Sequence, residues 1–137
     1  MKRMENFLAP YRPVLLSIFR IMIGLLILQF GTAKILGFPA VAAFANVTVG
    51  QWPAWYAGVL ELTFGALLTI GLFSRISAFV LSGLMAFAYF LGHAPRGLFT
   101  PLANNGTLPI LFCFAFLYLA AAGAGPWSAD AALRGKH

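Results

Sequence analysis

The stretch "WYAGVLELTFGALLTIGLFSRISAFVLSGLMAFAYFLG", residues 55–92, contains two long apolar runs that are separated only by Ser74 and Arg75. Each run approaches the ~20 residues that a helix needs to cross the hydrocarbon core of a bilayer. The connection between them allows only a sharp reversal of the chain. The stretch therefore predicts a tight antiparallel pair of transmembrane helices, at residues 55–73 and 76–92.

Two further apolar segments flank this pair, at residues 14–36 and 108–123. The first is longer than the apolar region of a signal peptide, which is about 7–15 residues. We therefore expect it to remain in the protein. In the last segment, Pro109 falls in the first turn, where its missing N–H does no harm. The fold prediction is an all-α membrane protein, a bundle of four transmembrane helices that forms a single domain over residues 1–137.

The composition agrees with a membrane protein and excludes other classes. The 137-residue chain is 61% apolar and 9% charged, whereas soluble domains are about 45–50% apolar and about 25% charged. Its net charge of +6 comes from basic residues scattered singly at the ends of apolar segments, which favours lipid headgroups over nucleic acid as the partner. The single cysteine, Cys113, lies inside an apolar run. The sequence thus predicts no disulfide framework and no metal site.

The distribution of lysine and arginine predicts the orientation. With an even number of spans, both termini lie on one side of the membrane. The basic residues expected on that side are Lys2, Arg3, Arg12, Arg75, Arg134 and Lys136, against Lys34 and Arg96 on the other. Because cytoplasmic loops are enriched in positive charge, we expect both termini in the cytoplasm and a multi-pass location in a bacterial inner membrane. The loop at residues 37–54, which carries Trp52, would then lie outside, either along the interface or as a re-entrant ligand-binding loop.

Arg20 and Glu61 are the costly residues of the spans, since a charge at the bilayer centre costs about 2.5–3.5 kcal/mol on insertion scales. Each lies on a helix stripe with glycines one turn away, a pattern that lets helices approach closely and predicts an interior-facing stripe. The two stripes are Arg20, Gly24, Ile27, Gly31 and Lys34, and Gly58, Glu61, Gly65 and Leu68. Two interpretations of Arg20 stay open, an ion pair with Glu61 or snorkelling to the interface. Glu61 is expected to be paired, protonated, or in contact with a ligand or a water cavity.

A comparable stripe on the third span consists of Ser82, Ala86, Tyr89 and His93, and it leads into "LGHAPRGLFTPLANNG", residues 91–106. We expect His93 to hydrogen-bond loop carbonyls rather than a metal. The stretch either sets a basic rim over an interior polar track or serves only to complete the helix end. The candidate functional residues of this track are Arg20, Lys34, Glu61, Tyr89, His93, Arg96 and Asn104.

The chain resembles the DoxX family of small four-helix inner-membrane proteins over about residues 17–132. The resemblance is carried by four segments in order: "FRIMIGLLILQFGTAKILGFP", "LELTFGALLTIGLFSR", "GHAPRGLFTPLANNG" and "AAAGAGPWSAD". The residues that match family positions are Arg20, Gly31, Lys34, Glu61, His93 and the terminal "GPWSAD". In one departure, Thr107 follows "NNG" where relatives usually carry an acidic residue, so a charge partner for Arg96 or His93 is missing.

The resemblance implies a redox association, because the family is similar to a membrane subunit of an archaeal thiosulfate:quinone oxidoreductase. The first function hypothesis is an accessory subunit of a membrane-associated redox or quinone-linked complex, with a membrane or peripheral oxidoreductase as partner. The second is an enzyme subunit that acts directly on a quinone or small sulfur compound through Glu61, His93 and Arg96. The third is a small transporter, which would need to form a homo-oligomer. No cofactor of its own is evident from the sequence, and a bound quinone stays open.

Overall fold

A computed structural model describes residues 1–135, and within that range the regular structure is helical throughout. Lys136, counted above among the basic residues near the termini, lies outside the described residues. The elements in chain order are α1 (Lys2–Leu8), η1 (Ala9–Tyr11), α2 (Arg12–Ile35), η2 (Ala42–Phe44), α3 (Ala54–Ile70), α4 (Ser74–Ala88), the π-helical turn η3 (Tyr89–His93), η4 (Ala94–Arg96), α5 (Thr107–Ala122) and α6 (Ala129–Arg134).

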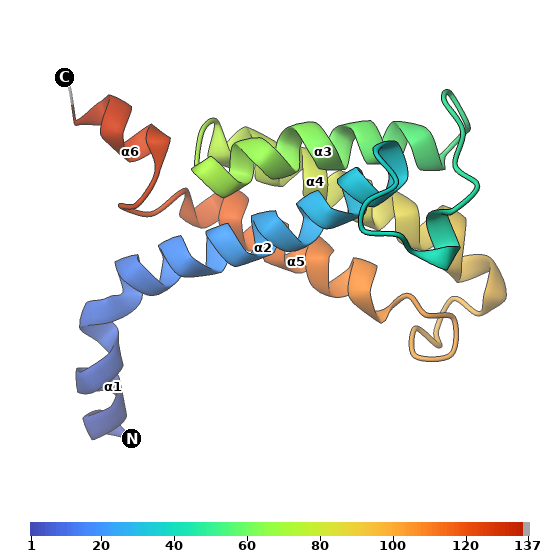
Figure 1. Cartoon of the computed structure of the whole chain (residues 1–137). Coiled ribbons are helices and arrows are strands. Elements are labelled where there is room, and N and C mark those ends of the chain that lie inside the picture. Colours follow the sequence, from blue (N-terminus) through green and yellow to red (C-terminus); the bar gives the residue numbers. More distant parts are fainter. Residues whose placement is uncertain (136–137) are drawn as a thin grey trace.

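The four long helices run alternately up and down, so the two ends of the bundle differ in content (Figure 1). One end carries α1, α6 and the short turn between α3 and α4, and we call it the terminal end. The other carries the loops at residues 36–53 and 97–106, and we call it the loop end. Within the bundle, α2 packs mainly on α3, and α4 mainly on α5.

All four segments expected to cross the membrane form helices. Two continuous helical stretches, Lys2–Ile35 and Ser74–Arg96, are long and apolar enough to span a bilayer by length and composition. The other two apolar helices are shorter, with 17 residues in α3 and 16 in α5. Gly71 ends α3 in the left-handed conformation, with φ of 78°, which glycine adopts without steric cost.

The bundle carries apolar side chains outside and several polar ones inside. Large residues such as Phe79, Phe114 and Leu111 are more than 60% exposed. The buried polar and charged residues are Ser17, Arg20, Glu61, Ser74, Ser77, Ser82 and Asn104. A soluble domain rarely exposes so much large apolar surface, whereas lipid solvates it and leaves the interior as the place for polar groups.

Glycines set how closely α2 and α3 approach and in which register. A Cβ added at Gly31 would lie 2.5 Å from the backbone nitrogen of Leu62, and one added at Gly24 would lie 2.9 Å from that of Thr69. Both glycines therefore face the backbone of α3 directly. This register confirms that the two predicted glycine stripes are buried against each other.

Candidate functional site

Arg20 lies at the terminal end and does not pair with Glu61. Its guanidinium donates to the carbonyl of Trp127 at 2.7 Å, to that of Thr69 at 3.4 Å, and to that of Ala124. The residue is 1% exposed, so these backbone carbonyls, and not water, surround its guanidinium. Arg20 instead joins the end of α3 to the segment after α5.

An apolar core separates Arg20 from Glu61, which explains why the expected pair does not form. The core lies between the four helices and consists of Ile27, Leu68, Ala78, Leu81, Met85, Phe112, Phe116 and Leu119. The α2–α3 register also places Arg20 beyond Thr69, near the end of α3. The sequence left a pair between Arg20 and Glu61 open, but the way α2 and α3 are aligned decides the partner.

The segment after α5 closes the terminal end through Asp130. Its carboxylate accepts the backbone N–H groups of Phe73 and Ser74, both at 2.9 Å, and so caps the start of α4. Partial burial disfavours the charged form of Asp130, but these hydrogen bonds and the charge of Arg134 outweigh it and hold the pKa of Asp130 below its ordinary value. Asp130 is therefore a structural clamp on the α3–α4 turn.

Two more side chains complete this closure. Arg75 donates to the carbonyls of Ala120 and Ala121, the last turn of α5, where a cation is favoured by the helix dipole. Ser17 Oγ accepts the N–H of Trp127 at 3.1 Å. The "GPWSAD" segment that carries part of the family resemblance is thus accounted for by packing and capping at this end.

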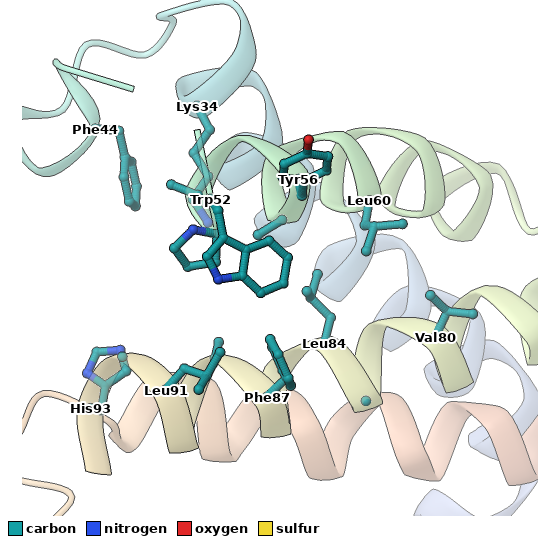
Figure 2. A pocket seen from close by; sticks show the side chains of 16 residues that line it. Lys34, Phe44, Trp52, Tyr56, Leu60, Val80, Leu84, Phe87, Leu91 and His93 are labelled. Atoms are coloured by element: carbon teal, nitrogen blue, oxygen red, sulfur yellow. The ribbon is translucent and has the colours of Figure 1, made fainter. Parts of the chain in front are cut away.

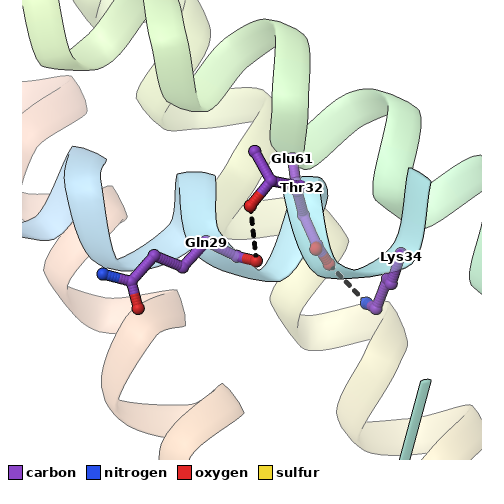
Figure 3. A network of polar contacts seen from close by, with 4 residues as sticks. All are labelled: Gln29, Thr32, Lys34 and Glu61. Atoms are coloured by element: carbon purple, nitrogen blue, oxygen red, sulfur yellow. Dashed lines mark hydrogen bonds and ion pairs between the residues drawn. The ribbon is translucent and has the colours of Figure 1, made fainter. Parts of the chain in front are cut away.

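Glu61 pairs with Lys34 toward the loop end. Lys34 Nζ donates to Glu61 Oε1 at 2.8 Å, with the two side chains 12% and 2% exposed (Figure 3). The ammonium also lies 5.0 Å from the ring centroid of Phe44 and 6.0 Å from that of Phe30, a cation–π arrangement. The second carboxylate oxygen, Glu61 Oε2, is buried and has no hydrogen-bond partner among the described residues.

A cavity of about 310 Å³ borders this ion pair inside the bundle. It is enclosed by all four long helices, η2 and the 97–106 loop. Its lining residues are Ile27, Phe30, Lys34, Ala43, Phe44, Glu61, Met85, Ala88, His93, Asn105, Leu108, Pro109 and Phe112. The cavity therefore combines aromatic and aliphatic walls with Lys34, Glu61, His93 and Asn105 as its polar groups, a composition typical of small-molecule sites.

A groove of about 470 Å³ runs between α3 and α4 on the outer surface of the bundle and also reaches Lys34 and His93 (Figure 2). Its walls are apolar, with Leu60 on α3 facing Leu84 and Phe87 on α4. Trp52 lies over the groove, with its ring 6.1 Å from that of Phe87. The groove and the cavity share Lys34, Phe44, Ala88 and His93 in their linings. One space opens on the outer surface between α3 and α4, the other lies between the four helices, and the polar side chains of Lys34 and His93 line both.

Tyr89, His93 and Asn104 fold the 97–106 loop onto the end of α4. Tyr89 donates to the carbonyl of Leu98 at 2.6 Å, and the amide of Asn104 donates to Gly97 O at 2.7 Å and accepts Gly106 N–H at 2.8 Å. His93 Nδ1 lies 2.8 Å from the carbonyl oxygen of Asn104. The sequence-based expectation that His93 bonds a loop carbonyl is confirmed.

The seven predicted residues thus divide into three groups. Arg20 belongs to the terminal end, Lys34 and Glu61 form the buried pair, and the remaining four surround the 97–106 loop, namely Tyr89, His93, Arg96 and Asn104. His93 is the member that connects the last two groups, since it both holds the loop and lines the cavity. Arg96 is exposed and contacts Gly92 O and His93 Nδ1, both at 3.3 Å.

Sequence reasoning missed the roles of Asp130, Phe44 and Trp52. Asp130 had a usable signal, because the chain has only three acidic residues and such a scarce group in a membrane protein is seldom idle. Phe44 and Trp52 fell in the 37–54 loop, for which the sequence left two interpretations open, an interfacial segment or a re-entrant ligand-binding loop. Their place beside Lys34 and Phe87 depends on how the 36–53 loop folds back, which a single sequence does not specify.

Comparison with known proteins places the chain among its relatives. The sequence model of the DoxX family matches residues 15–94, more than half of the chain. A protein of Haemophilus influenzae described only as uncharacterized is 43% identical over 127 residues, covering 91% of this chain and 95% of the relative. No solved structure matches the chain.

Proposed function

The chain belongs to the DoxX family, and from this membership and the geometry of the loop end we propose that it is a membrane subunit of a redox complex that binds a quinone-type lipid. The observation that carries the proposal is the junction of the apolar groove with the cavity beside Lys34 and Glu61. A quinone combines an isoprenoid tail with a polar ring. The groove offers a place for the tail and the cavity a place for the ring.

The charge of the cavity favours a neutral ring over a small sulfur anion. Lys34 is already neutralised by Glu61 at 2.8 Å, so a bound anion would compete with the carboxylate for the same cation and leave a buried charge unpaired. The other basic residue nearby, Arg96, is exposed and does not line the cavity. We therefore place quinone binding ahead of direct chemistry on a sulfur compound.

The role we assign is that of an accessory subunit, with electrons supplied by a partner oxidoreductase. The polar groups of the cavity, namely Lys34, Glu61, His93 and Asn105, can bind and orient a ring but carry no electrons themselves. If this is right, the protein isolated from native membranes should carry with it a protein with a flavin or iron–sulfur spectrum. That complex should reduce or oxidise added quinone, and separated components should lose this activity.

We further propose that α2, α3, α4 with its η3–η4 extension, and α5 all cross a bacterial inner membrane, with the termini in the cytoplasm. The short helices α3 and α5 fit because a bilayer thins locally around short spans at modest cost. Lys2, Arg3, Arg12, Arg75 and Arg134 lie at the terminal end, on the side expected to be cytoplasmic. A reporter fused to the C-terminus should read cytoplasmic, and one inserted after the exposed Leu102 should read extracytoplasmic.

Quinone extraction tests the central part of this proposal. The protein would be purified from bacterial membranes in mild detergent and extracted with organic solvent, and the quinone content would be measured per chain. A helical membrane protein of similar size, purified in parallel, reports the background carried by detergent micelles. We expect a near-stoichiometric quinone or quinol. Content at the background level, together with no binding of added short-chain quinone or quinol in lipid nanodiscs, would refute quinone binding.

A further inference from the structure

We propose that the loop-end cavity selects the reduced, hydroxyl-bearing form of its ligand, a quinol, over the matching quinone. The inference rests on the proposed function, since it concerns the same cavity, and it adds which redox state is bound. It follows from the hydrogen-bonding character of the polar atoms that the protein leaves unpaired there.

Glu61 supplies the first unpaired atom. Oε1 accepts the Lys34 ammonium at 2.8 Å. A positive charge this close favours the ionised carboxylate, which can only accept hydrogen bonds. Oε2 is buried without a partner among residues 1–135, on a side chain that is 2% exposed and lines the cavity. A buried acceptor left unsatisfied destabilises the protein, and more so when it is charged. A ligand that donates to Oε2 would remove this cost.

The N–H groups of Lys34 do not offset the preference for a quinol. Its ammonium is held by Glu61 Oε1 and lies near the faces of Phe44 and Phe30, at 5.0 and 6.0 Å from the ring centroids. These contacts satisfy the cation electrostatically. The ammonium has three N–H donors and Glu61 takes one, so a ligand oxygen can accept from another; a quinol oxygen can do this as well as a quinone carbonyl, and Lys34 therefore does not favour the quinone.

His93 supplies the second acceptor. Its Nδ1 lies 2.8 Å from the carbonyl oxygen of Asn104, which can only accept, so Nδ1 carries the hydrogen. Arg96 also lies near this nitrogen, at 3.3 Å, and can only donate; the shorter contact with the Asn104 carbonyl, at 2.8 Å, decides the assignment. In the neutral ring, Nε2 then has a free lone pair. The tautomer is thus set by the loop that the histidine holds.

Two polar atoms that line the cavity are therefore acceptors, Glu61 Oε2 and His93 Nε2, while the amide of Asn105, which also lines it, can both donate and accept. A quinol carries two O–H donors, so it can complete one or both of them. The matching quinone has the same ring and tail but only carbonyl acceptors, which would face the Glu61 carboxylate unfavourably. Because ring shape and apolar area hardly differ between the two forms, hydrogen bonding decides the preference.

The test compares three ligands on the wild-type protein in lipid nanodiscs without oxygen. They are a short-chain ubiquinol, the matching ubiquinone, and the dimethyl ether of the quinol, which keeps the ring but has no donor. Binding would be followed by the fluorescence of Trp52, which lies over the groove. We expect the quinol to bind at least about tenfold more tightly than either of the others, the effect of one hydrogen bond to a charged acceptor.

Equal binding of quinol and quinone, or tighter binding of the quinone, would overturn the inference and leave the proposed function intact. Absence of binding by all three ligands would instead remove the proposed function and the inference with it. Glu61→Gln supplies an amide N–H that can meet a carbonyl, so the quinol preference should fall to about onefold. A Lys34→Gln, Glu61→Gln double variant, which leaves no unpaired charge, should also lose the preference if the single variant does not fold.

Glu5→Gln is the matched control for these variants. Glu5 lies in α1 at the terminal end, is exposed, and lines neither the cavity nor the groove. The same chemical change there should leave the tenfold preference unaltered. A loss of preference in Glu5→Gln equal to that in Glu61→Gln would assign the effect to net charge and contradict the role of Oε2.

Discussion

The two ends of the bundle use buried charge in opposite ways. At the terminal end, Arg20 and Asp130 are bound to backbone carbonyl and N–H groups, and they join α6 and the segment before it to α3 and α4. At the loop end, Lys34 and Glu61 bind each other, leave one carboxylate oxygen unpartnered and border a cavity. The first arrangement uses these charged groups to close the structure, with Arg20 Nε left unpaired, whereas the second leaves a carboxylate oxygen free beside a cavity.

This contrast shows which buried charges to read as functional. A charge within a membrane span is by default a candidate for function, and both Arg20 and Glu61 meet that description in the sequence. Their surroundings separate them: Arg20 donates to three backbone carbonyls of the same chain, whereas Glu61 has a free acceptor that borders a cavity. The predictions below are ordered by the size of the expected effect, and each can weaken or refine this contrast.

Breaking the Lys34–Glu61 pair should have the largest effect. Lys34→Met or Glu61→Leu alone leaves a buried charge without its partner, which typically destabilises by about 3–5 kcal/mol. The Lys34→Met, Glu61→Leu double variant should recover much of this loss, because a buried ion pair can often be replaced by apolar side chains. Thermal unfolding in detergent would measure the cycle. Additive losses, with coupling below about 0.5 kcal/mol, would show that the pair is not an energetic unit.

Arg20→Met should destabilise the terminal end by about 2–4 kcal/mol, since it leaves the carbonyls of Ala124, Trp127 and Thr69 without their donor. Arg20→Lys should recover only part of the lost stability, because one ammonium cannot match the planar fork of a guanidinium. The fraction of the Arg20→Met protein that stays folded should bind the quinone-type ligand as the wild type does. Thermal melting and ligand titration on the same samples would check this, and a binding defect without loss of stability would make Arg20 functional and blur the contrast.

Two glycines test whether the α2–α3 contact is as close as described. Gly31→Ala should cost about 1–3 kcal/mol, since the new methyl would meet the backbone of Leu62 at 2.5 Å and force the helices apart. Gly83→Ala is the matched control on α4, where nothing lies within 4 Å, and it should be neutral or stabilising by up to about 1 kcal/mol. Equal effects of the two substitutions on the melting temperature would argue against the close contact between Gly31 and the backbone of α3.

Asp130→Asn should have the smallest effect, about 1 kcal/mol or less, because the carboxylate is partly exposed and solvent screens it. Its pKa is lowered from the ordinary 3.8 in the folded state. The stabilisation is therefore complete above that ordinary pKa and is lost as pH falls below it, through the lowered pKa. Melting of the wild type and the variant should differ at pH 7 and converge as the solution is acidified toward pH 2. A constant difference across this range would mean that ionisation of Asp130 is irrelevant.

The helices and their buried faces could be predicted from the sequence because they depend on local patterns. The stripes through Gly24 and Gly31 on α2 and through Gly58 and Gly65 on α3 are buried as expected. The partner of Glu61 could not be predicted, because helical depth depends on where the 36–53 loop returns the chain. Lys34 lies on the expected stripe, yet only the register between α2 and α3 brings it, and not Arg20, to the carboxylate.

The cavity and the groove could not be predicted from the sequence. They arise where α2–α3 packs less extensively on α4–α5 than each pair does within itself, a property of tertiary packing. The 97–106 loop was singled out for its polar residues, and its hydrogen bonds account for Tyr89 and Asn104 as loop supports. Of Tyr89, His93 and Asn104, only His93 also lines the cavity. It lies at the end of a π-helical turn, which the sequence pattern did not predict.

Filling the groove tests the account most directly. Gly83 lines the groove on α4 and has no neighbour within 4 Å of a Cβ built there, so Gly83→Leu should block the space for a ligand tail without straining the bundle. Ile76→Phe, at an exposed position of α4 outside the groove, is the control for added bulk. The measurement is quinone plus quinol per chain after purification, with thermal melting alongside. The account predicts that Gly83→Leu stays folded and loses its ligand while Ile76→Phe retains it; full occupancy in a folded Gly83→Leu would contradict it.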